Sequence, residues 1–117
     1  MVDTSVWVDF WRRGNTRLAQ LLGQDRVVVH PFILGELALG RLARRADVLR
    51  DLQALESSRV AEHDEVLALI DRTPLWGRGI GWVDAHLIAS ALLDRLHLWT
   101  LDQRLASVAA SLGVGPR

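Results

Sequence analysis

The sequence predicts an α/β domain in which helices cover a central parallel β-sheet of four or five strands. Short apolar segments alternate with amphipathic helical segments along the chain, which is the pattern of a parallel sheet flanked by helices. The 117 residues suit a single domain over residues 1–117. Half of the residues are apolar and about a quarter are charged, a balance typical of a globular protein.

The predicted strands are short and apolar. The segments are residues 1–2, 27–29, 59–61 and 96–101, with a fifth expected around Val114. The third segment has the weakest strand pattern. Because the fifth is a single apolar position, the prediction is four or five strands.

Helices are predicted between these strands from apolar residues three and four positions apart. The first crossover is expected to contain helices over residues 5–12 and 16–22. Pro31 suits the first turn of a helix over residues 31–40. Further helices are predicted over residues 44–55, 83–93 and about 105–112, the last ending near Gly113. The 83–93 segment is apolar nearly all round, which predicts a central position.

Four carboxylates, Asp3, Glu36, Asp84 and Asp102, lie where an apolar run breaks or a helix begins. Acids in such apolar settings are costly unless they are paired, hydrogen-bonded or metal-bound. Asp3 and Asp102 fall at two strand ends, Asp84 at a helix start and Glu36 within a helix. If the first and fourth strands are neighbours, the four acids converge at the carboxyl edge of the sheet. Such an oxygen-lined pocket suits Mg²⁺ or Mn²⁺.

Each acid also has a simpler interpretation. Asp84 and Asp102 are good helix caps, and Asp3 is a good turn residue before a helix. Glu36 is harder to explain in this way, because an acid in the apolar helical stretch of Leu34, Gly35 and Leu37 either faces solvent or needs a partner.

Composition removes several classes of site and location. The chain has no cysteine, which excludes disulfides, thiolate metal sites and cysteine nucleophiles. No apolar stretch approaches the roughly 20 residues that span a bilayer, and no signal segment is evident, so a cytoplasmic location is expected. Basic and acidic residues balance at 14 each. Any attraction to a polyanion must therefore be local.

A glycine-rich loop precedes Asp84, with glycines at positions 77, 79 and 81. Trp76, Arg78 and Trp82 in this region are candidates to stack on or grip unpaired bases. Packing of the tryptophans within the loop is the simpler alternative.

Four stretches of the chain together resemble one known family. They are residues 3–8 (DTSVWV), 35–37 (GEL), 82–89 (WVDAHLIA) and 98–105 (LWTLDQRL). The sequence resembles the PIN-domain ribonucleases and, within them, the VapC-type toxins of bacterial toxin–antitoxin pairs. The resemblance covers essentially the whole chain and implies a single PIN-like nuclease domain with three layers. One departure is that only Met1 and Val2 precede Asp3, whereas the family usually has a longer first strand.

The resemblance implies a metal-dependent endoribonuclease in which Asp3, Glu36, Asp84 and Asp102 bind Mg²⁺ or Mn²⁺. By the same matching, Thr4, Ser5 and Thr100 would be polar neighbours of the site. It also implies an RNA substrate, inhibition of translation or growth, a cognate antitoxin protein and a homodimer, with no membrane partner.

Three alternatives differ in their sequence requirements. A haloacid-type phosphatase needs a second Asp at the position of Ser5, and a receiver domain needs a lysine, which this chain lacks. The third alternative is a non-catalytic PIN-like module that binds metal or RNA.

Overall fold

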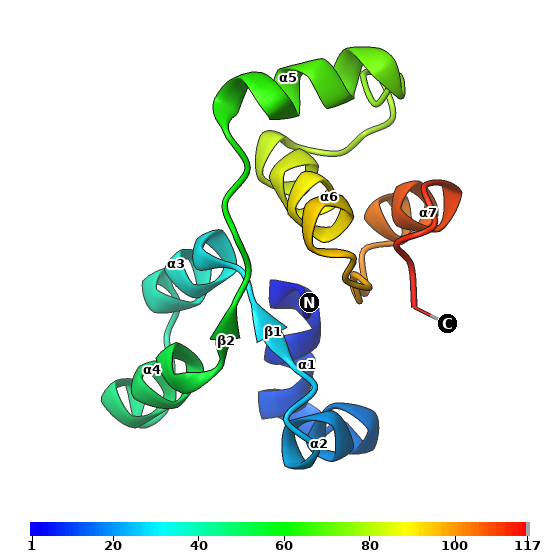
Figure 1. The fold of residues 1–117 in the computed structure, drawn as a ribbon. Coiled ribbons are helices and arrows are strands. Elements are labelled where there is room, and N and C mark those ends of the chain that lie inside the picture. The colour runs from blue at the N-terminus through cyan, green and yellow to red at the C-terminus, as the bar shows by residue number, and fades with distance from the viewer. Residues whose placement is uncertain (117) are drawn as a thin grey trace.

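The computed structural model describes residues 1–116 and is rich in helices. Its elements, in chain order, are α1 (Thr4–Arg13), α2 (Thr16–Gly23), β1 (Val28–Val29), α3 (Pro31–Leu39), α4 (Arg45–Ala54), β2 (Glu56–Ser57), α5 (His63–Arg72), α6 (Trp82–Asp94) and α7 (Gln103–Ser111). In Figure 1, α3 and α4 lie on one side of the β1–β2 pair, and α7 lies at the end of the molecule near the C-terminus. None of the helices within residues 1–116 combines the length and apolarity needed to cross a bilayer.

The sheet of the described residues is smaller than predicted. β1 and β2 pair in parallel, with Val28 opposite Glu56 and Val29 opposite Ser57. A separate parallel bridge joins Val2 to Trp99. The structure therefore has a parallel α/β core, but a two-stranded sheet and one bridge stand where four or five strands were expected.

The predicted adjacency of the first and fourth strands is confirmed. The Asp3 N–H donates to the Trp99 carbonyl, and the Trp99 N–H donates to the Met1 carbonyl, both at 2.9 Å. On its other side this segment meets the predicted fifth strand, since the Leu98 N–H donates to the Val114 carbonyl at 2.6 Å. The 98–99 segment therefore lies between the first residues of the chain and Val114.

The prediction of a strand over residues 59–61 was wrong. The third strand lies earlier, at β2, and the Arg59 N–H donates instead to Asp94 Oδ2 at 3.0 Å. The Arg59 side chain also bonds Asp94 Oδ1 at 2.7 Å. Because Arg59 is bound to the end of α6, its N–H is not available to a sheet.

The predicted helices are found within one or two residues of their expected ends, and α5 is additional. α5 begins with a capping box in which the Glu62 N–H donates to Glu65 Oε1 at 2.9 Å. It packs against α6. The central position of α6 is confirmed, because every residue from Ala85 to Ala91 is buried. The beginning of α6 brings Asp84 to the site described next.

Candidate functional site

The four acids come from four separate segments of the fold. Asp3 is the N-cap of α1 and is 9% exposed, directly after the Val2–Trp99 bridge. Asp102 is the N-cap of α7, and Asp84 lies in the first turn of α6. Glu36 lies in the middle of α3. The helix-cap interpretation is thus correct for Asp102, whose side chain caps α7. Asp84 contributes to the cap of α6 from its third position, where it accepts from the Gly81 N–H, and the Asp3 side chain makes no cap hydrogen bond.

Asp3 is held by two hydroxyl groups through one oxygen. Ser5 Oγ donates to Asp3 Oδ2 at 2.9 Å, and Thr100 Oγ1 donates to the same oxygen at 2.7 Å. Each hydroxyl has only one hydrogen, so both are committed to this carboxylate. The same hydroxyls accept bonds from the backbone of the 100–102 segment: Ser5 from the Leu101 N–H at 2.9 Å and Thr100 from the Asp102 N–H at 3.0 Å. This network fixes the positions of Asp3 and Asp102 relative to one another.

The other acids are also anchored through one oxygen each. Glu36 Oε1 accepts from Thr4 Oγ1 at 3.2 Å, and Asp84 Oδ2 accepts from the Gly81 N–H at 3.0 Å. Asp102 Oδ1 caps α7 by accepting from the Arg104 and Leu105 N–H groups at 2.9 and 3.1 Å. These bonds restrict the rotation of each carboxylate.

The second oxygen of each of these carboxylates accepts no hydrogen bond from the described part of the protein. Within residues 1–116, no protein group donates a hydrogen bond to Asp3 Oδ1, Glu36 Oε2, Asp84 Oδ1 or Asp102 Oδ2. In the same part of the chain, none of the four acids forms an ion pair. Each acid is therefore oriented by one oxygen while the other remains available to a ligand.

The negative charges of the acids shift the pKa values of their neighbours. Although Glu36 is exposed, partial shielding from water raises the pKa of its carboxyl, and the negative charges of Asp3 and Asp84 raise it further, against the effect of the Thr4 hydrogen bond. Burial also raises the pKa of Asp84, with added repulsion from Asp3 and Asp102, against the effect of the Gly81 N–H. The group carries an unfavourable concentration of negative charge, which a cation would relieve.

The donor chemistry of this group fits a hard divalent cation, because carboxylate and hydroxyl oxygens are the ligands that Mg²⁺ and Mn²⁺ prefer. The carboxylate groups are, however, too far apart to coordinate one ion together. Among the described residues, no three Asp, Glu or His side chains are close enough to hold a metal ion as they are placed. The acids share a region of the molecule without yet converging on one point.

One residue near the acids was not identified from the sequence. The side chain of Arg104, in the first turn of α7, packs on Gly79 of the glycine-rich loop, so closely that a Cβ at Gly79 would lie 2.8 Å from it. Gly79 also has a φ of +79°, which favours glycine. A cation at a helix N-terminus is unfavourable. The position of Arg104 just after Asp102 was therefore the signal in the sequence that could have singled it out.

Comparison with known proteins gives the class to which this fold and site belong. The PIN domain matches residues 1–111, and the chain belongs to the PIN-domain family. The chain is similar to Ribonuclease VapC32 of Mycobacterium tuberculosis, strain ATCC 25618 / H37Rv, with 48% identity over 115 residues. That alignment covers 97% of this chain and 93% of the relative. Ribonuclease VapC32 of strain CDC 1551 / Oshkosh has the same identity and coverage.

Proposed function

We propose that this protein is a metal-dependent endoribonuclease of the VapC type, with Asp3, Glu36, Asp84 and Asp102 as its catalytic, metal-binding acids. The observation that carries the proposal is the state of these four carboxylates. Each is anchored by one oxygen, keeps the other free of protein donors, and has no basic partner within residues 1–116. The name of the similar proteins, Ribonuclease VapC32, supports RNA as the substrate.

The residues of the chain have distinct tasks in this mechanism. Ser5 and Thr100 hold the Asp3 carboxylate so that Oδ1 is presented to the ligand, and Thr4 does the same for Glu36 Oε2. The backbone N–H groups at the starts of α6 and α7 hold Asp84 and Asp102. When bound, Mg²⁺ or Mn²⁺ supplies an activated water and neutralises charge on the phosphate and the leaving oxygen. Because the anchors are already in place, little side-chain entropy remains to be lost on binding.

The proposal extends to the biological role. We assign the protein as the toxin of a toxin–antitoxin pair, which inhibits translation or growth and is neutralised by a cognate antitoxin. Carboxylates with raised pKa values and no cation attract an Arg or Lys side chain, so a basic antitoxin residue inserted among them gives inhibition a physical basis. A homodimer and a cytoplasmic location belong to the same proposal. So do a single domain over residues 1–117 and a sheet completed to four or five strands around the Val2–Trp99 bridge.

The test is cleavage of single-stranded RNA by the purified protein with Mg²⁺, with Mn²⁺ and with excess chelator. Cleavage is expected only with metal, and Asp3→Asn is expected to abolish it. The alternative, a non-catalytic PIN-like module, predicts binding of RNA or metal without cleavage under any condition. The ribonuclease name of the relatives favours the enzyme. Undiminished cleavage in chelator would refute the metal role.

A further inference from the structure

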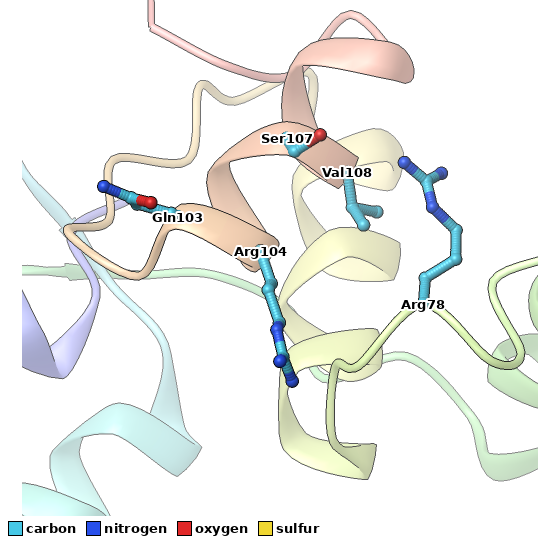
Figure 2. A pocket seen from close by; sticks show the side chains of 5 residues that line it. All are labelled: Arg78, Gln103, Arg104, Ser107 and Val108. Atoms are coloured by element: carbon cyan, nitrogen blue, oxygen red, sulfur yellow. The ribbon is translucent and has the colours of Figure 1, made fainter.

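A shallow hollow next to the acids is lined by two arginines. Its lining residues are Arg78, Gln103, Arg104, Ser107 and Val108, and its volume is about 290 Å³. Figure 2 shows Arg78 rising from the loop before α6 toward α7, while Arg104 runs from α7 down toward that loop. The two cationic side chains thus run in opposite directions across the space between two segments.

Neither arginine has an acidic partner in the described part of the chain. Arg78 donates from Nη1 to Ser111 Oγ at 3.3 Å, and the Arg104 side chain makes no ion pair there. Arg13 and Arg59, by contrast, pair with Asp9 and Asp94. The residues of the hollow therefore present two uncompensated positive charges together with the polar side chains of Gln103 and Ser107.

Arg104 lies directly against the loop that bears Arg78. Gly79 lies against Arg104 so closely that its missing Cβ would meet Arg104 Cδ and Nη1, both at 2.8 Å. Arg104 is also in the first turn of α7, where its charge opposes the helix dipole. Packing on Gly79 uses the length of the Arg104 side chain but leaves its charge uncompensated, and a ligand of opposite charge would compensate it.

Both walls of the hollow lead directly to candidate catalytic acids. On one wall, Arg104 follows Asp102, which accepts from the Arg104 N–H at 2.9 Å. On the other, the loop that bears Arg78 ends at Gly81, whose N–H binds Asp84 at 3.0 Å. At a rise of about 1.5 Å per residue, Ser107 lies only about 7.5 Å along the helix axis from Asp102. A polymer held at the acids would extend over the hollow.

We propose that Arg78 and Arg104 form a phosphate-binding subsite that holds the RNA backbone beside the bond to be cleaved. The inference rests on the proposed ribonuclease function. Guanidinium groups suit phosphate because they offer several N–H donors and a permanent charge. Gln103 and Ser107 add neutral donors along the same face of α7. The subsite binds backbone and not bases, so it positions RNA without reading sequence.

The test measures RNA binding separately from cleavage. Binding of a fluorescein-labelled single-stranded RNA oligonucleotide is followed by anisotropy in chelator, over a series of salt concentrations, for the wild type and for the Arg78→Ala/Arg104→Ala protein. We expect affinity to fall about tenfold or more, as for loss of a charge-assisted hydrogen bond. The slope of log K against log salt should shrink by about 0.7 for each phosphate group that the variant no longer neutralises. In cleavage assays with metal, KM for RNA should rise more than kcat falls.

Matched variants separate binding from folding. Arg17→Ala removes an exposed arginine of α2 that has no ion pair in the described residues, and it should leave affinity and salt slope unchanged. Arg78→Lys/Arg104→Lys keeps both charges and should recover most of the salt slope. If the alanine protein has a normal melting temperature and the wild-type salt slope, the subsite is refuted. Loss of antitoxin binding with RNA binding intact would refute it as well and assign the hollow to the protein partner. Failure of the ribonuclease proposal is distinct, because the wild type itself would then cleave no RNA.

Discussion

Replacing Asp84 with Asn changes one oxygen of the site and little else. The Asn side-chain oxygen can still accept from the Gly81 N–H, which Asp84 Oδ2 does at 3.0 Å. The atom that changes is Oδ1, which has no donor in the described residues and becomes an NH₂ group. A free acceptor is thereby replaced by a donor, which repels a cation. The substitution tests the ligand-binding oxygen while it preserves the start of α6.

The expected effect of Asp84→Asn on RNA cleavage is much larger than its expected effect on stability. Changing residues that only orient a metal ligand costs about 10- to 100-fold in affinity or activity, so loss of a ligand itself should reduce cleavage by at least about 100-fold. For stability, loss of a negative charge near a helix N-terminus costs about 0.3–1 kcal/mol. Relief of burial and of repulsion from Asp3 and Asp102 acts in the opposite direction. The melting temperature should therefore change by less than about 4 °C, the shift for roughly 1 kcal/mol at this size.

The assay compares cleavage of single-stranded RNA and thermal unfolding in the same preparations. Asp71→Asn on the exposed face of α5 is the matched control, because it makes the same chemical change outside the acid group. The control should cleave RNA like the wild type. Near-normal cleavage by the Asp84→Asn protein would refute the role given to Oδ1. A melting temperature lowered far beyond about 4 °C would show that Asp84 is needed mainly for the fold.

Three further outcomes follow from the site. Without metal, Glu36→Gln should stabilise the protein at pH 7, because the folded state raises the pKa of Glu36 and so disfavours its ionised form. This gain in the free energy of unfolding should shrink as the pH falls through the raised pKa toward the ordinary value of about 4.3. Urea unfolding at several pH values measures it, and a gain that does not change with pH would contradict the cause given. Thr100→Val removes a donor to Asp3 and an acceptor for the Asp102 N–H. It should lower the free energy of unfolding by about 2 kcal/mol and the rate of RNA cleavage by about 10- to 100-fold. Unaltered cleavage would show that Asp3 needs no such anchor. Expression alone should arrest growth, and co-expression with the adjacent small protein should relieve the arrest and yield a co-purifying complex; normal growth and a lone monomer on sedimentation would end the toxin proposal.

The sequence predicts helices well here because each has a local signal. Pro31 marks the start of α3, and Gly113, with a φ of +76°, follows the end of α7. α5 was missed although Glu62 and Glu65 form a capping box before Val66, Leu69 and Ile70 at helical spacing. This helix too is encoded in its own segment.

The strands were less predictable because two-residue strands have no period to detect. β2 consists of Glu56 and Ser57, both exposed, and only pairing with β1 makes it a strand. The adjacency of Val2 and Trp99, by contrast, was anticipated, since convergence of the acids requires it. The contact of Arg104 with Gly79 joins residues remote in sequence, and no local pattern encodes it.

The hydroxyl of Thr100 has a consequence for how the protein is made. It binds an oxygen of Asp3, 97 residues earlier in the chain, and it also accepts from the Asp102 N–H. Synthesis proceeds from the amino terminus, and contacts between distant residues form late. While residues 100–102 of a nascent chain are still inside the ribosome, Asp3 lacks the Thr100 hydroxyl that anchors it. Asp102 has then not yet joined the other acids. The ribosome, itself built of RNA, is exposed to the four assembled acids only after residue 102 has left it.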